Sequence, residues 1–169
     1  MARLSQDKWI DAGIDAIAAT GPTALAAEPL ARRLKTTKGS FYWHFKDVPA
    51  FQAAVLTRWQ SRALEQVLHQ VRMTTDPDKG LRTFGALILS DKVEPQLRIW
   101  ARNDPRVAKA LAEVDAEREA HLTRLLGQLG LRNVSFARAL QASLVGLSLQ
   151  KKPDKAAFET LIDTVLALQ

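Results

Sequence analysis

The segment LAAEPLARRLKTTKGSFYWHFKD, residues 25–47, predicts two short helices joined by a tight turn. Thr37 can cap the second helix, because its hydroxyl can accept a hydrogen bond from a free backbone N–H of the first turn. Phe41 and Phe45 lie four residues apart, so they share the inward face of that helix. A helix of about two turns is not stable alone. We therefore expect neighbouring helices to support it, which leaves its outward face free for contact with a partner.

The outward face of the second helix combines positive charge with aromatic groups. Trp43 lies opposite the two phenylalanines, and Tyr42 lies beside it. The stretch from Arg32 to Lys46 contains five cations, Arg32, Arg33, Lys35, Lys38 and Lys46, and no carboxylate. Cations neutralise phosphates, and aromatic and hydroxyl groups can meet base edges or sugars. The pattern favours a helix-turn-helix that binds nucleic acid; the alternative is a solvated basic turn over a buried aromatic pair.

The same segment resembles the signature of the TetR/AcrR-type transcriptional regulators. Many positions carry the resemblance together: Thr37, Gly39, Phe41, Tyr42, His44, Phe45, Lys46 and Asp47. It is close over residues 5 to about 60 and extends further only through the helical layout. Two positions depart from the family pattern. Lys35 stands where the family usually has the turn glycine, and we expect it to strain the turn. Ala26 stands where a Ser or Thr usually caps the first motif helix, at a cost of about 1 kcal/mol.

The position of each polar group on the second motif helix predicts its role on DNA. Lys38, Tyr42 and Trp43 are expected to reach base edges or thymine methyl groups. Phosphate contacts are expected mainly from Thr37, Ser40, His44 and Lys46. Together with Gly39 on the outward face, these residues form the predicted DNA-binding site.

Length and composition limit the remaining possibilities. The chain has 169 residues, of which 47% are apolar, so it can build a sizeable core. Its net charge of +6 suits a negatively charged partner. It contains no cysteine, which excludes disulfides and thiolate chemistry. We see no signal peptide and no apolar run of the ~20 residues that span a bilayer. We therefore expect a soluble, cytoplasmic protein.

Apolar residues recur at helical spacing along the whole chain, and no stretch alternates as a strand would. The sequence predicts an all-α fold of about nine helices. Residues 1–47 are expected to form a three-helix DNA-binding domain of the helix-turn-helix type, and residues 48–169 a helical domain for effector binding and dimerisation. A helix of about 25 residues is expected to follow Asp47 and could transmit movement to the motif; a plain connecting helix is the alternative.

No catalytic or metal constellation stands out. Glu117 and His121 lie one helical turn apart and could share a metal, but no further ligands are visible. The acidic residues nearby, together with Arg118 and Arg124, are interpreted as a solvated helix face. We therefore predict no enzymatic activity, no metal and no cofactor.

Large aromatic and aliphatic residues of the second domain form a candidate effector pocket: Trp59, Phe84, Ile88 and Trp100. Such a pocket would take an apolar or amphipathic small molecule. Ordinary core packing is the alternative, and base rates favour it. The resemblance supports the pocket, because regulators of this family generally carry an effector site in the second domain.

Residues 134–149 are apolar nearly all round, and residues 156–168 carry an apolar stripe. One domain can cover only part of this surface, so the two helices are predicted to form a homodimer interface. Its expected members are Phe136, Leu140, Leu144, Leu147, Phe158, Leu161, Ile162 and Val165. The alternative is that this helix pair belongs to the core of a single chain.

The resemblance implies a DNA-binding regulator, more often a repressor than an activator, released from a palindromic operator by a small-molecule effector. A different class of function is also open. The chain could be a helical interaction protein that keeps the fold but has lost DNA or effector binding. Steeply salt-dependent DNA binding would separate the two.

Overall fold

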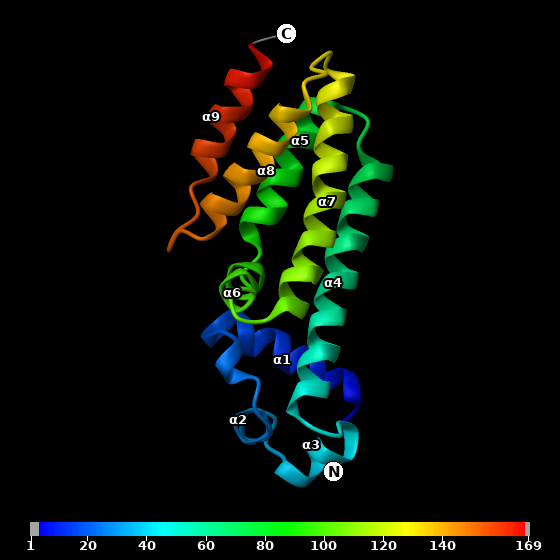
Figure 1. The fold of residues 1–169 in the computed structure, drawn as a ribbon, viewed down its shortest axis with the longest axis vertical. Coiled ribbons are helices and arrows are strands. Elements are labelled where there is room, and N and C mark those ends of the chain that lie inside the picture. Colours follow the sequence, from blue (N-terminus) through cyan, green and yellow to red (C-terminus); the bar gives the residue numbers. More distant parts are fainter. Residues whose placement is uncertain (1–3, 168–169) are drawn as a thin grey trace. The chain divides into compact units, whose positions relative to one another are not determined.

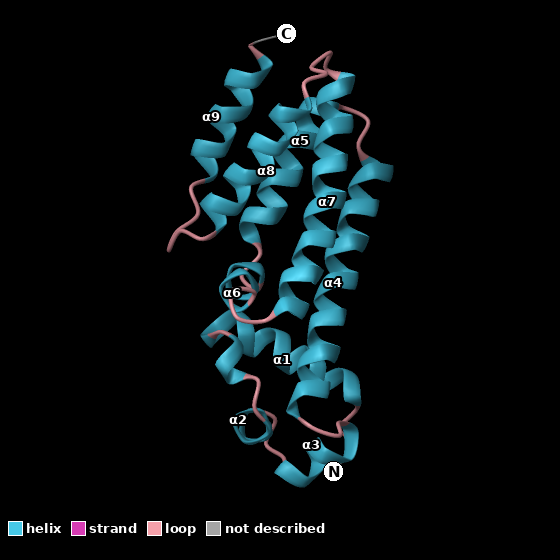
Figure 2. Ribbon diagram, in the orientation of Figure 1, coloured by secondary structure: helices cyan, strands magenta, loops and turns pink. Residues whose placement is uncertain are grey.

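The computed structural model describes residues 4–167, and helices are the only regular secondary structure in that range (Figures 1 and 2). The described residues form nine α-helices: α1 (Gln6–Thr20), α2 (Ala27–Arg33), α3 (Lys38–His44), α4 (Val48–Met73), α5 (Pro77–Ser90), α6 (Glu94–Trp100), α7 (Pro105–Gln128), α8 (Val134–Ser148) and α9 (Lys155–Leu166). A short 3₁₀ helix, η1 (Pro22–Ala24), separates α1 from α2. The predicted all-α fold is confirmed.

Helix starts follow the capping residues of the sequence. The Lys8 N–H donates to Ser5 Oγ (3.4 Å), and the Ser40 N–H donates to Thr37 Oγ1 (3.3 Å). Asp47 Oδ1 accepts from the Ala50 N–H (2.7 Å) at the start of α4. Ala26 occupies the N-cap of α2 without a side-chain bond, as expected from its methyl group. These caps satisfy donors that helix geometry leaves without partners.

The chain forms two compact units, and each unit is built from two separate segments of the sequence. The first unit contains the chain up to Arg62 together with Lys92–Leu111. The second contains Ala63–Asp91 together with the chain from Ala112 onward. The long helices α4 and α7 each contribute to both units. The domain boundary predicted after residue 47 stays a prediction.

In the first unit, α1 packs on the start of α4 at very close range. A Cβ built on Gly13 would lie 2.8 Å from both Phe51 and Val55, so only glycine fits that crossing without rearrangement. Trp9 and Ile17 of α1 are fully buried in the same core. The support for the helix-turn-helix is therefore a rigid apolar layer.

In the second unit, α5, α8 and α9 pack against one another (Figure 1). Their shared core contains Phe84 and Ile88 from α5, Leu144 from α8, and Phe158 and Ile162 from α9. At the surface, Arg82 links α5 to α9. It hydrogen-bonds Asp78 (2.8 Å), Asp163 (2.6 Å) and Glu159. Helix α9 is thus fastened by both apolar and ionic contacts.

Candidate nucleic-acid interface

Helix α3 is anchored by its two phenylalanines. Phe41 is 0% exposed, and its ring centroid lies 5.4 Å from that of Trp9 in α1, edge to face. Phe45 lies directly after the helix, with its ring 4.9 Å from that of Phe51 in α4. Phe41 and Phe45 also contact each other, at 5.3 Å. Edge-to-face and tilted ring pairs add to the free energy of burial. This cluster holds a helix of seven residues that would otherwise melt.

The opposite side of α3 is turned outward. Tyr42 is 48% exposed and Trp43 is 67% exposed, although large aromatics are usually buried. Lys38 Nζ lies 5.8 Å from the centroid of the Tyr42 ring, which places a cation over an aromatic face. Of the predicted DNA-binding residues, Ser40 and His44 are half-buried. The others are exposed: Thr37, Lys38, Gly39, Tyr42, Trp43 and Lys46.

The turn before α3 contains the one non-glycine residue with positive φ among those described. Lys35 has φ +53°, as the sequence predicted for a lysine in the place of the turn glycine. The Thr36 N–H donates to the Ala31 carbonyl (2.9 Å), and the Lys35 N–H donates to the Arg32 carbonyl (3.2 Å). This pair of bonds is the Schellman ending of a helix, whose left-handed position glycine normally occupies. The turn fixes how α3 follows α2.

Comparison with known proteins identifies this helix-turn-helix. Residues 10–47 match the family model described as "Bacterial regulatory proteins, tetR family". The helix-turn-helix of residues 10–47 is therefore of the TetR-family type. This match supports a DNA-binding transcriptional regulator. Because the match ends at residue 47, it contains the whole helix-turn-helix described above.

Solved structures of similar fold cover nearly the whole chain. A transcriptional regulator from Rhodococcus sp. Rha1 is 20% identical, with a TM-score of 0.77, and the match covers 98% of this chain and 95% of that one. A regulator from Saccharomonospora viridis, solved in complex with choline, is 14% identical with a TM-score of 0.76 and coverages of 96% and 95%. FadR from Bacillus subtilis, in complex with stearoyl-CoA, is 14% identical with a TM-score of 0.68 and coverages of 96% and 98%. No curated protein matches the sequence.

The four predicted effector residues are divided between the compact units. Trp59 and Trp100 belong to the first unit. Trp59 is buried, whereas Trp100 is half-buried and lines a cavity of about 110 Å³ together with Leu56. Phe84 and Ile88 are buried in the core of the second unit. An effector site shared by all four stays a prediction.

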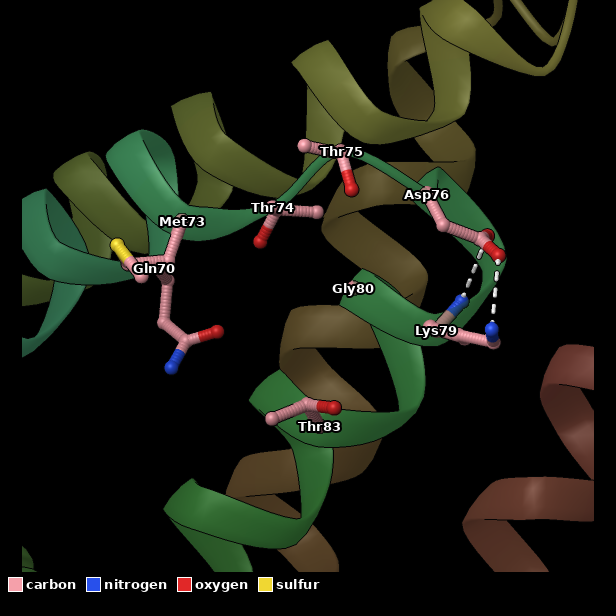
Figure 3. A pocket seen from close by; sticks show the side chains of 8 residues that line it. All are labelled: Gln70, Met73, Thr74, Thr75, Asp76, Lys79, Gly80 and Thr83. Atoms are coloured by element: carbon pink, nitrogen blue, oxygen red, sulfur yellow. Dashed lines mark hydrogen bonds and ion pairs between the residues drawn. The ribbon is translucent and has the colours of Figure 1, made fainter.

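A separate pocket of about 270 Å³ lies where α4 ends and α5 begins (Figure 3). Figure 3 shows Gln70, Thr74 and Thr83 around it, with Asp76 joined to Lys79 at its rim. None of the predicted effector residues lines this pocket. Six of its eight lining residues have polar side chains, whereas the sequence predicted a site lined by aromatic and aliphatic residues.

The polar face predicted for α7 is only partly solvated. Arg118 is 3% exposed and His121 is 2% exposed. The interpretation of Arg118 as part of a solvated face is therefore wrong. Helix α7 is packed on several sides, so some of its polar side chains point into the protein. The His121 ring lies edge to face against Phe84 at 4.8 Å, while Glu117 remains exposed. No group of three or more His, Cys, Asp or Glu in residues 4–167 could hold a metal ion.

Sequence reasoning missed a set of buried hydrogen-bonding groups in the second unit. Arg124 Nη2 donates to His121 Nδ1 (3.0 Å), so the proton of a neutral His121 ring lies on Nε2. Burial, reinforced by the charge of Arg124, lowers the pKa of His121 to about 4. Gln141 Nε2 donates to Asp115 Oδ1 (2.9 Å). His121 Nε2 and Gln141 Oε1 have no hydrogen-bond partner among the described residues. These groups are distinguished from other polar side chains only by their burial, and the sequence does not reveal burial.

The predicted interface residues also divide into two groups. Leu140, Leu144, Phe158, Ile162 and Val165 are buried in the second unit's own core. Phe136, Leu147 and Leu161 are only partly buried and border that core.

None of the described helices is long and apolar enough to cross a membrane.

Proposed function

We propose that this regulator is a repressor that binds a palindromic operator as a homodimer and leaves it when a small molecule binds. The observation that carries the proposal is the two-sided α3. Its phenylalanines are locked into the core, while Lys38, Tyr42 and Trp43 project outward from a rigid support. In this proposal the chain acts on DNA in the cytoplasm and has no catalytic role.

The contact roles follow from position on α3. Lys38, Tyr42 and Trp43 reach base edges or thymine methyl groups in the major groove. Thr37, Ser40, His44 and Lys46 hold phosphates, with Gly39 allowing the backbone to approach closely. Phosphate contacts fix the register and base contacts select the sequence. The exposure of six of these eight residues supports this division.

The homodimer forms through α8 and α9. Their inward residues already fill the second unit, so the contact with a second copy rests on the partly buried Phe136, Leu147 and Leu161. The exposed Val134 and Leu149, at the two ends of α8, extend this apolar surface. Helix pairs of this kind pack into four-helix bundles about a two-fold axis. Two reading heads then match two operator half-sites.

The effector site lies in the second unit and is amphipathic. Phe84 and Ile88 supply apolar surface, and His121 and Gln141 supply a buried donor and a buried acceptor that the protein itself leaves unpaired. Buried polar groups normally have partners, so such groups are suited to a ligand. Relatives of the same fold solved with choline and with stearoyl-CoA support small-molecule binding in general. The uninterrupted α4, which begins directly after the matched segment, would carry the response.

The deciding experiment is selection of bound sequences from a random duplex library by the purified protein. A palindromic consensus with steeply salt-dependent affinity supports the proposal. The competing function is a helical interaction protein that has lost DNA or effector binding. Failure to enrich any sequence would favour that alternative, and a single non-repeated half-site would contradict the dimer.

A further inference from the structure

Helix α2 ends in a turn that is unusual in one respect. The two Schellman hydrogen bonds, from Thr36 and Lys35, place residue 35 in the left-handed region at φ +53°. In this region the Cβ of an L-residue crowds the following carbonyl oxygen. Among the described residues, Lys35 is alone in having a side chain there. An outlier of this kind points to a function that offsets its cost.

The same chain shows the unstrained version of this turn. At the end of α7, the Leu131 N–H donates to the Leu126 carbonyl (2.9 Å), and the Gly130 N–H donates to the Gly127 carbonyl (3.1 Å). The residue in the left-handed position there is Gly130, at φ +83°. The hydrogen-bond pattern is that of α2, with glycine in the place of Lys35. Nothing in the turn itself therefore requires a lysine.

The charges around Lys35 do not offset the strain. Its side chain is exposed, and it takes part in no ion pair among the described residues. The nearest carboxylate before it in sequence, Glu28, pairs with Arg32 at 3.3 Å. The next carboxylate after it in sequence is Asp47, which caps α4. Lys35 thus adds a like charge to an already basic segment, and this disfavours the folded state of the protein alone.

We propose that Lys35 binds a DNA phosphate beside the recognition helix, and that the strained turn orients it for this contact. The inference rests on DNA binding through α3 and adds a residue outside that helix. Lys35 stands between the last hydrogen bonds of α2 and Thr37, which caps α3. Both of its neighbours are therefore anchored. The direction in which the Lys35 side chain leaves the backbone is fixed relative to α3 before DNA binds. Less conformational entropy is therefore lost when the contact forms.

The test compares three variants of the full chain on a random-sequence duplex, because a phosphate contact is independent of sequence. Lys35→Gly should raise Tm by about 2–4 °C. It should also weaken DNA binding about 3- to 10-fold at 0.1 M salt and lower the slope of log K against log salt by about 0.9 per reading head. Lys35→Asn, which tolerates the left-handed region, should lose the same affinity. Lys35→Arg should keep both the affinity and the slope.

Lys152→Gln serves as the matched control, because Lys152 is an exposed lysine in the loop between α8 and α9. It should leave the salt slope unchanged. Equal reductions of the slope by Lys152→Gln and Lys35→Gly would show an effect of net charge and overturn the proposal. An unchanged slope and affinity in Lys35→Gly and Lys35→Asn would overturn it as well. A Lys35→Gly protein that is no more stable than the parent would refute the strain on which the inference rests.

Discussion

Neighbouring residues of α3 have opposite environments. Phe41 has no exposed surface, and the next two residues, Tyr42 and Trp43, are about half and two thirds exposed. The helical period produces this division, since residues one position apart point about 100° away from each other. The anchor and the proposed reading surface therefore share one helix of seven residues. A substitution is expected to affect either folding or recognition according to its position.

Replacing Lys38 and Tyr42 together by Ala should remove base contacts. Each lost contact typically costs about 1–3 kcal/mol of discrimination, so the preference for the selected operator over random DNA should fall sharply. Affinities for both duplexes can be measured by fluorescence anisotropy. Ser40→Ala is the matched contrast, because loss of a phosphate contact should weaken both duplexes alike. An unchanged operator preference in the double variant would refute the assignment of base contacts.

His121 should make stability depend on pH. Its folded pKa of about 4 lies below the ordinary value of 6.5, so the unfolded chain binds more protons between these pH values. The contribution is complete above pH 6.5 and is lost as the pH falls toward 4, at about 1.4 kcal/mol per unit at most. Urea unfolding of the parent and of His121→Gln at several pH values measures it. The replacement of the exposed His69 by Gln is the control.

At the scale of elements, α9 is fastened to α5 by one arginine. Arg82 bonds Asp163, Glu159 and Asp78, and these bonds, with Asp163 the largest contributor, raise the pKa of Arg82 above its ordinary value. The network is partly exposed, so solvent weakens each pair. Beneath it, Phe158 packs into the core.

Replacing Arg82 by Met should loosen α9 selectively. We expect a loss of about 1 kcal/mol in unfolding free energy, and faster amide exchange in α9 than in α8. Hydrogen exchange followed by mass spectrometry resolves the two helices. Arg138→Met, which removes a single exposed pair with Glu119 (3.3 Å), should change neither quantity. Uniformly faster exchange across the second unit would contradict a local role for Arg82.

The proposed dimer interface can be tested without damaging the core. Leu147→Glu together with Leu161→Glu places charges on partly buried positions, where a symmetric partner would desolvate them at a cost of several kcal/mol. The double variant should sediment as a folded monomer and lose operator binding. Leu144→Glu is the contrast, because Leu144 is fully buried in its own chain and this variant should unfold. A double variant that remains dimeric would place the interface elsewhere.

At the scale of the whole molecule, the proposed function requires two reading heads in a fixed register. Each head enters a major groove, and successive grooves on one side of B-DNA are about 34 Å apart. Inserting about half a helical turn, roughly 5 bp, between operator half-sites moves them to opposite sides of the duplex. Affinity should then fall toward the value for random DNA, and a full-turn insertion should restore part of it. Equal affinity for all three spacings in a gel-shift assay would exclude simultaneous binding by both heads.

The sequence by itself determined the local features of this protein. Thr37 caps α3 as expected, Ser5 and Asp47 cap α1 and α4, and Phe41 and Phe45 are buried beneath an exposed Tyr42. Even the strained turn at Lys35 followed from its place in the pattern. Capping, turn geometry and helical period all depend on residues within about five positions of one another, so a single chain segment contains the information.

Only the tertiary structure decided which side of a helix with several packed faces is covered. Helix α8 is apolar nearly all round, and its sequence does not distinguish Leu144, which is fully buried, from Leu147, which is partly exposed. The polar run of α7 likewise conceals that His121 and Arg118 lie inside. The physical reason is that burial depends on neighbours distant in sequence. Helical periodicity orders residues around an axis, but it does not state which neighbouring helices cover each side.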